Sequence, residues 1–215
     1  PKEVTRKEWK IVMGTLPMEG AMRREARKSL FEATPTSEED LEVSVDFITW
    51  FEAVAFCNAL SRRANLEPVY RIEGNRVSWN RNASGYRLPT EEEWEYAARG
   101  GRFRGEFRYS GSQKPESIAR FGLPPEAGPE VPGKLVPNQL GLYDMSGNVA
   151  EWCWNVFLPY DAEGFGKDSD DPTLPRAVRG GTWMSEADSI TVSARIGIPP
   201  SARQRGVGLR LVRNR

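Results

Sequence analysis

The chain has 215 residues, and its 30 basic and 30 acidic side chains give a formal net charge of zero at pH 7. This balance excludes the strong basic excess of a general nucleic-acid-binding protein, so no nucleic-acid partner is expected. No stretch approaches the roughly 18 apolar residues of a transmembrane helix. The length fits one domain over residues 1–215 with a sizeable core. No targeting segment is visible, and we expect a chain processed or trimmed before Pro1.

Missing and rare residue types exclude several kinds of catalysis. Histidine is absent, which removes Ser-His-Asp chemistry, Cys-His chemistry and histidine metal sites. The two cysteines, Cys57 and Cys153, allow one disulfide at most, and we interpret them as buried thiols that pack as small apolar groups. Seven tryptophans, 20 glycines and 16 prolines favour a loop-rich fold anchored by aromatic side chains.

The N-terminal third of the chain predicts two helices. A charged stretch over Met22–Phe31 is typical of a surface helix. From Trp50 to about Ala64, apolar side chains recur at helical spacing, which predicts an amphipathic helix with one buried face. Thr49, followed three residues later by Glu52, forms a capping box at its start. The apolar face consists of Trp50, Ala53, Val54, Cys57 and Leu60.

A second amphipathic helix is predicted over Glu91–Arg99. Thr90 and Glu93 form another capping box, and the glutamates of the first turn complement the positive end of the helix dipole. Gly100 and the glycine after it end the helix. Trp94 lies on the face that we expect to be buried.

The remaining segments predict short strands and long loops. Val69–Ile72 and Arg76–Trp79 flank a Gly-containing turn and predict a hairpin. Trp152 and Trp154 occupy alternate positions, which indicates a strand with one aromatic face. We also predict surface loops over Ser110–Asn138 and Asp161–Pro175, and strands over Ala177–Arg179, Ile190–Arg195 and Gly208–Val212.

Three segments carry a family resemblance: Gly85–Gly100, Asn138–Trp152, and Arg179–Trp183 together with Gly208-Leu209-Arg210. In this order they resemble the formylglycine-generating-enzyme, or sulfatase-modifying-factor, family. The resemblance extends more weakly over nearly the whole chain. It implies an α+β, C-type lectin-like fold, in which two helices pack on small, twisted, mostly antiparallel sheets with much irregular loop.

The resemblance also implies where catalytic residues would lie. The family's oxidase activity resembles copper-assisted thiol chemistry and needs two cysteines after the Gly-Gly turn. Those positions hold Ser185 and Ile190 here, and neither side chain can form the thiolate that such chemistry requires. A related branch builds a non-haem iron centre with histidines, which this chain lacks. We therefore expect no enzyme, with an enzyme of unrecognised chemistry as the less favoured alternative.

A structural calcium ion is a further expectation from the resemblance, and no other cofactor is expected. Relatives often hold calcium near the Gly-Asn turn, where Asn148, Glu151 and the Val149 carbonyl would supply the oxygen ligands that calcium prefers. The alternative is that Asn148 stabilises a turn and Glu151 pairs with a nearby arginine.

The segment 183–207 resembles the diversified part of the variable proteins of diversity-generating retroelements. In that family, mutagenesis of template adenines turns AAC codons into other codons that end in C. Met184 and Glu186 have no such codon. The residues that pass this test, and that we predict to be variable and ligand-binding, are Ser185, Asp188, Ser189, Ala194, Ile196, Gly197, Ile198, Ser201, Ala202, Arg205, Gly206 and Val207.

A variable surface requires a backbone that other residues hold in place. Arginine can bridge carboxylates and loop carbonyls, and the four expected to do so are Arg179, Arg195, Arg203 and Arg210. Trp183 would anchor the segment to the core. We expect Ile196, Ile198 and Val207 to form an exposed apolar patch; in the alternative, they are core residues of an invariant module.

The sequence thus favours a non-catalytic binding protein that displays a diversified C-terminal surface. Its expected ligand is another macromolecule, a protein or a glycan. By the resemblance we expect it at the cell surface or outside the cell. The main alternative is a fixed interaction or structural module with the same fold.

Overall fold

A computed structural model describes residues 1–17, 37–159, 169 and 171–214. The predicted surface helix over Met22–Phe31 lies outside the described residues. The helices are α1 (Arg6–Met13), α4 (Glu39–Glu42), α5 (Trp50–Arg63) and α6 (Glu91–Ala98), with 3₁₀ turns η1 (Gly101–Phe103), η2 (Pro125–Ala127) and η3 (Ala187–Ile190). The strands are β1 (Tyr70–Glu73), β2 (Arg76–Trp79), β3 (Tyr86–Arg87), β4 (Ala150–Val156), β5 (Arg176–Arg179), β6 (Arg195–Ile198), β7 (Val207–Gly208) and β8 (Val212–Arg213).

Both predicted amphipathic helices are confirmed to within about one residue. The Thr49 side chain accepts from the Glu52 N–H, and the Glu52 side chain accepts from the Thr49 N–H, so the capping box of α5 is complete. Thr90 and Glu93 do the same for α6. The hairpin is also confirmed as β1 and β2, which pair antiparallel from Tyr70↔Trp79 to Glu73↔Arg76.

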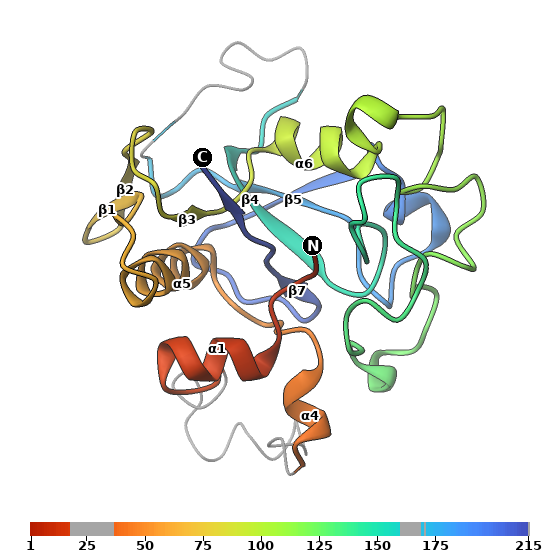
Figure 1. Cartoon of the computed structure of the whole chain (residues 1–215), viewed down its shortest axis with the longest axis horizontal. Helices are drawn as coiled ribbons and strands as arrows, with labels where there is room; N and C mark the ends of the chain where they lie inside the picture. Colours follow the sequence, from red (N-terminus) through yellow and green to blue (C-terminus); the bar gives the residue numbers. More distant parts are fainter. Residues whose placement is uncertain (18–36, 160–168, 170, 215) are drawn as a thin grey trace.

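The central sheet has four strands in the order β6-β5-β4-β7. Its pairs are antiparallel except β4 with β7, which run parallel. A separate two-stranded sheet joins β3 to β8. Figure 1 shows β4 and β5 crossing the middle of the molecule between α5 and α6. This is the α+β architecture that the sequence predicts.

Strand β4 separates two apolar clusters, and it is buried along its whole length. Trp152 and Trp154 pack into the larger cluster with Trp50 of α5. Cys153, which points the other way, packs in a smaller cluster with Trp94 of α6. The predicted aromatic face is therefore present, but the opposite face is buried as well because α6 covers it. Cys57 and Cys153 are free, buried thiols, as predicted.

Two strand predictions are wrong at the C-terminal end. Ile190 belongs to η3, and the strand begins only at Arg195; Ile190 and Val192 are apolar because they anchor an irregular loop in the core. The strand predicted over Gly208–Val212 is divided between β7 and β8, which belong to different sheets. The predicted strand over Ala177–Arg179 is confirmed as β5.

Candidate functional site

Arginine side chains attach the C-terminal segment to helices α5 and α6. Arg195 donates through Nη2 to Glu91 Oε2 on α6 at 2.6 Å, and its Nε donates to the other oxygen of the same carboxylate. Arg203 donates to Glu52 on α5 and, at 3.1 Å, to the Phe47 carbonyl. These contacts confirm that the two arginines bridge carboxylates and loop carbonyls.

Two further arginines hold the turns on either side of the segment. Arg179, which is 1% exposed, donates to Glu95 Oε2 at 2.5 Å and to the Val192 carbonyl at 2.9 Å. Arg210 donates to Glu151 Oε2 at 2.6 Å and to the Tyr143 carbonyl at 2.8 Å. The backbone around residues 183–207 is thus tied down by side chains that do not belong to the predicted variable set.

A groove of about 350 Å³ opens along this segment. Part of it is formed by the turn at Gly180 and Gly181 and by Thr182. Its lining includes seven of the twelve predicted ligand-binding residues: Ser185, Asp188, Ser189, Ala194, Ile196, Arg205 and Val207. The other five (Gly197, Ile198, Ser201, Ala202 and Gly206) lie outside it. The structure therefore brings most of the predicted set onto one concave surface.

The groove combines apolar and polar groups. Ala150, Val178 and Val207 contribute buried side chains, whereas Ile196 is 52% exposed. Hydroxyls of Thr182, Ser185 and Ser189 and the amide of Gln204 add hydrogen-bonding groups. Such a mixture of apolar surface and a few polar groups is typical of a binding site.

Two charged side chains of the groove have partners on neighbouring segments. The Arg205 guanidinium lies 5.7 Å from the centre of the Trp183 ring. Asp188 accepts from Arg108 Nη2 at 2.6 Å. Both Asp188 and Arg108 are largely exposed, so this pair is expected to add little to stability. Because Asp188 lines the groove, this exposed ion pair is accessible to a ligand.

Trp183 anchors the segment, as predicted. Its side chain is fully buried. Its backbone N–H donates to the Asn148 carbonyl at 2.9 Å, and its backbone carbonyl accepts from the Leu123 N–H at 2.8 Å. Gly206 packs against this anchor with φ +80°, and an added methyl would lie 2.8 Å from Thr182 and 3.2 Å from the Trp183 ring. Gly206 therefore cannot vary freely, which corrects the expectation for this residue.

Three more of the twelve residues are restricted by packing. Ile198 and Val207 are each 2% exposed and belong to the larger apolar cluster. The expected exposed patch of Ile196, Ile198 and Val207 is therefore wrong, and Ile196 is its exposed member. Gly197 is exposed, but a methyl there would collide with the Phe157 ring. Ile196 and Ile198 are two residues apart on β6 and therefore face the same side of the sheet. They differ because Ile198 packs in the larger apolar cluster, whereas Ile196 lines the groove.

Ser201 and Ala202 lie at the start of α5, next to Pro200, whose carbonyl accepts from the Trp50 N–H at 3.1 Å. Ser201 is exposed, whereas Ala202 packs partly against the larger cluster. These two positions could contact a ligand only at a surface separate from the groove.

The positions of the family's two thiols, Ser185 and Ile190, meet at Gly181. A methyl on Gly181 would lie 2.7 Å from Ile190 Cγ2 and 3.3 Å from Ser185 Oγ. Ser185 Oγ accepts from the Thr182 N–H at 2.9 Å, and Ile190 is fully buried. The pair thus offers one hydroxyl, already engaged in a turn, and one aliphatic side chain. Neither group is a soft metal ligand.

The predicted calcium ligands have other partners. Asn148, at φ +58°, donates to Glu3 Oε2 at 2.5 Å and accepts from the Glu130 N–H at 2.8 Å. Glu151 Oε2 accepts from Trp94 Nε1 and Arg210 Nε, each at 2.6 Å. Asn148 therefore stabilises a turn and Glu151 pairs with an arginine, which is the alternative given by the sequence. Glu151 Oε2 is thus already paired with Arg210, whereas Oε1 is buried without a hydrogen-bond partner among the described residues. Calcium binding at these two side chains stays a prediction.

Two other observations concern the described residues alone. They contain no group of three or more acidic or cysteine side chains placed to hold a metal ion. They also contain no helix with the length and apolar character needed to cross a bilayer.

Some groove residues are not in the predicted set. Gly180 and Gly181 are expected from the sequence to allow close backbone approach before Trp183, but they were outside the predicted ligand-binding set. Thr182 and Gln204 line the groove but were outside the predicted set, and Gln204 has no codon that ends in C. The contact of Arg108 with Asp188 has no local sequence signal, because the two residues lie 80 positions apart.

Comparison with known proteins agrees with this fold. The chain matches the sequence model of the sulfatase-modifying factor enzyme 1-like domain over residues 2–215, and it belongs to this family. The solved structure of Treponema denticola variable protein 1 superimposes with a TM-score of 0.77 and 31% identity, covering 97% of this chain and 81% of that one. The fold is thus the C-type lectin-like fold of the formylglycine-generating-enzyme type, and the chain is similar to a retroelement variable protein.

Two curated relatives show the breadth of the family. The chaperone protein LppX of Paenibacillus barcinonensis is 32% identical over 245 residues, which cover 99% of this chain and 78% of the relative. The inactive C-alpha-formylglycine-generating enzyme 2 of Mus musculus is 29% identical over 187 residues, which cover 80% of this chain and 49% of the relative. The family therefore includes members that are named as inactive.

Proposed function

We propose that this chain is a non-catalytic binding protein that recognises a macromolecular ligand with the groove of residues 183–207. The observation that carries the proposal is the convergence of seven predicted ligand-binding residues on one groove of about 350 Å³. The arginine contacts to α5 and α6 support it, because they hold the backbone independently of the groove side chains. Similarity to Treponema denticola variable protein 1 supports the same role.

The non-catalytic part of the proposal is supported by Ser185 and Ile190 at the two thiol positions. Its test is incubation of the copper-loaded protein with a cysteine-containing sulfatase peptide. We expect no formylglycine by mass spectrometry. Turnover that survives copper controls and disappears in a Cys57→Ser, Cys153→Ser double variant would contradict this part.

The proposal of a diversified surface covers fewer residues than the twelve predicted from the sequence. Ser185, Asp188, Ser189, Ala194, Ile196 and Arg205 line the groove without belonging to the apolar core. We propose that these six are the variable ligand contacts, displayed at the cell surface or outside the cell. A neighbouring reverse-transcriptase gene with a template repeat matching codons 183–207 is the expected genomic finding. Its absence would favour a fixed module.

The fixed-module alternative has one observation in its favour. Ile198 and Val207 pass the codon test, yet both are core residues. Substitutions at these two positions in natural copies of the gene would be costly in either case. Variation limited to the six groove residues is therefore the pattern that separates a diversified surface from a fixed one.

Binding is tested with two display libraries of the full chain. One randomises the six groove residues, and the control randomises exposed positions of the β1–β2 hairpin, including Arg71, Ile72 and Arg76. Both are selected on one purified globular protein and on a glycan array. We expect specific, well-folded binders from the groove library alone. Equal yields from both libraries, or none from the groove library, would overturn the proposed function.

A further inference from the structure

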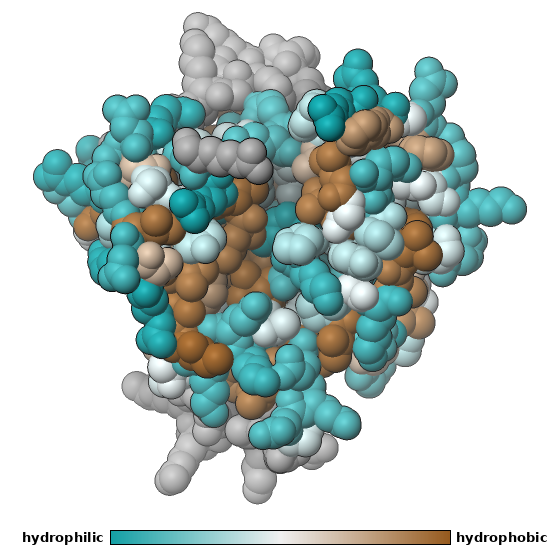
Figure 2. All heavy atoms as spheres, in the orientation of Figure 1, coloured by the Kyte–Doolittle hydropathy of each residue, from teal (hydrophilic) through white to brown (hydrophobic). Residues whose placement is uncertain are grey.

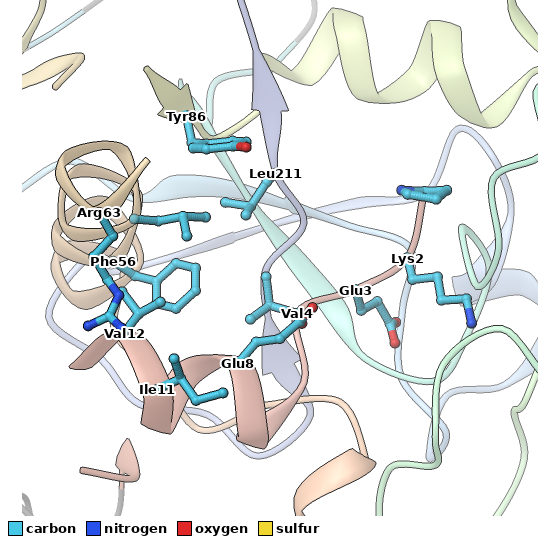
Figure 3. Close-up of a pocket in the computed structure, with 12 residues that line it drawn as sticks. Lys2, Glu3, Val4, Glu8, Ile11, Val12, Phe56, Arg63, Tyr86 and Leu211 are labelled. Atoms are coloured by element: carbon cyan, nitrogen blue, oxygen red, sulfur yellow. The ribbon is translucent and has the colours of Figure 1, made fainter. Parts of the chain in front are cut away.

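A second groove, of about 500 Å³, lies between α1, α5 and β8 and shares no residue with the first. Its size falls within the range of small-molecule sites. Figure 3 shows its apolar side chains pointing toward one another from separate elements: Val12 from α1, Phe56 from α5, and Leu211 next to β8. The groove is therefore an apolar cavity between elements that are distant in sequence.

The burial of the lining changes from base to rim. Phe56 is 1% exposed and Val4 is 4% exposed, whereas Ile11 on α1 is 56% exposed. Figure 2 shows hydrophobic side chains on this face of the molecule, over α5 and the neighbouring segments. A ligand with an apolar body would remove this surface from water, which is favourable. Exposed apolar surface that lines a concavity is typical of a binding site.

The charged residues of the groove differ in their availability. Glu8 is held by the Thr5 N–H at 2.8 Å, within the capping box of α1. Glu3 accepts from Asn148, Ser44 and the Val149 N–H. Both carboxylates thus already have donors. The donors that the groove can offer to an anionic ligand are therefore its two cationic side chains.

Lys2 and Arg63 supply this positive charge at opposite ends of the groove (Figure 3). Lys2 Nζ lies 5.6 Å from the centre of the Tyr143 ring. Arg63 is exposed and, among the residues that the structure describes, forms no ion pair. One end of the apolar groove therefore presents a guanidinium that can take a carboxylate.

We propose that this groove binds a long-chain fatty acid, with its carboxylate at Arg63 and its alkyl chain along Val12, Phe56 and Leu211. Arg63 at one end forms no ion pair with the described residues, whereas Lys2 at the other end lies against the Tyr143 ring. The Arg63 guanidinium and the apolar lining beyond it match a molecule with a single anionic head and an unbranched apolar body. The proposal is independent of the ligand-binding role of residues 183–207, because the two grooves have no residue in common.

The probe is cis-parinaric acid, whose fluorescence rises when its chain leaves water. The full chain is titrated below the concentration at which the acid aggregates, and palmitate and palmityl alcohol compete. We expect saturable, one-to-one binding that palmitate displaces. The alcohol should compete about tenfold less well or worse, because a carboxylate–guanidinium contact is a strong hydrogen bond.

Two variants at exposed positions test the groove without disturbing the core. Ile11→Asp should weaken binding of parinaric acid about tenfold or more, because it places a carboxylate on the apolar rim. Arg63→Glu should weaken palmitate binding by a similar factor and leave the alcohol unaffected. The matched controls are Ile72→Asp on the β1–β2 hairpin and Arg62→Glu on the same turn of α5; neither residue lines the groove. Both controls should bind like the wild type.

Three results would overturn the proposal. The first is the absence of saturable binding by the folded wild-type protein. The second is equal weakening in Ile72→Asp and Ile11→Asp, which would indicate non-specific adsorption. The third is equal affinity for acid and alcohol, with no effect of Arg63→Glu, which would exclude a carboxylate ligand.

Discussion

The guanidinium of Arg195 donates to both carboxylate oxygens of Glu91, a residue 104 positions earlier on α6. The two side chains are only 8% and 6% exposed. This ion pair fixes the edge strand β6, and with it one wall of the groove, to a helix on the opposite side of the sheet from Ile196. It explains how the groove side chains could change while the backbone stays in place.

Replacing Arg195 with alanine should lower the free energy of unfolding by about 3 kcal/mol, the lower end of the cost of breaking a buried ion pair, because the buried Glu91 carboxylate keeps only the 3.5 Å contact with Arg179 Nη1. The control is Arg71→Ala, which breaks an exposed pair with Glu73 and should cost less than about 1 kcal/mol. Urea denaturation measures both. Equal, small losses would show that the buried pair does not hold the segment.

Trp94→Ala and Trp183→Ala should each destabilise the domain by about 3–5 kcal/mol, the usual cost of emptying a fully buried aromatic site. Trp94 is 1% exposed and Trp183 0%. Trp94→Ala also removes an N–H that donates to Glu151 at 2.6 Å. Thermal and urea unfolding measure the change, and an unaltered melting temperature in either variant would contradict the packing described above.

Pooled substitution of the C-terminal segment should separate two groups of residues. Changes at Asp188, Ser189 and Ile196 should alter stability by less than about 0.5 kcal/mol, because their side chains are exposed at the groove. Alanine at Ile198 should cost about 2–5 kcal/mol, and alanine at Gly206 should be strained at its positive φ. A folding readout by protease resistance checks this. Uniform tolerance, or uniform loss, would contradict the division.

Glu3 should make the domain less stable as the pH rises. Burial raises the pKa of Glu3 well above its ordinary value, and the neighbouring charges of Asp144 and Glu151 raise it further. In the unfolded chain the carboxyl ionises near its ordinary pKa of about 4.3. The stabilising contribution is therefore complete below that pH and is lost as the pH rises through the raised folded pKa.

Glu3→Gln removes this titration. Relative to the variant, the wild type should lose free energy of unfolding as the pH rises above the ordinary carboxyl pKa of about 4.3, as measured by urea denaturation at several pH values. A difference between the two proteins that stays constant with pH would show that Glu3 ionises in the folded protein as it does in the unfolded chain.

Calcium should leave the melting temperature unchanged, with or without a chelator, because Glu151 already pairs with Arg210 and Asn148 is already hydrogen-bonded to Glu3 and Glu130. Differential scanning fluorimetry in both buffers measures this. A calcium-dependent rise that Asn148→Ala removes would restore the ion that the family resemblance implies.

Local signals in the sequence were sufficient for α5, α6 and the β1–β2 hairpin. Helix α1 was not predicted, although Thr5 and Glu8 form the same kind of capping box at its start. The Thr-x-x-Glu pairs at Thr49 and Thr90 place the starts of α5 and α6 because both partners lie within one turn.

Local signals could not predict the groove, since the Arg195–Glu91 contact that fixes one of its walls joins residues 104 positions apart. The family resemblance placed the segment, but it could not separate Ile196 from Ile198. Both side chains lie on the same side of β6. Ile198 is covered by the larger apolar cluster and Ile196 lines the groove, and only the tertiary packing determines this difference.

Val178 and Val207 belong both to the main apolar cluster and to the lining of the first groove. A ligand that covers them would also cover part of the core. Because such a ligand would bind only the folded chain, it should raise the free energy of unfolding by about 2.7 kcal/mol at 100 times its dissociation constant. The stability of the domain therefore reports ligand binding directly. Candidate macromolecules can be screened by melting temperature without a label and without knowing which residues they contact.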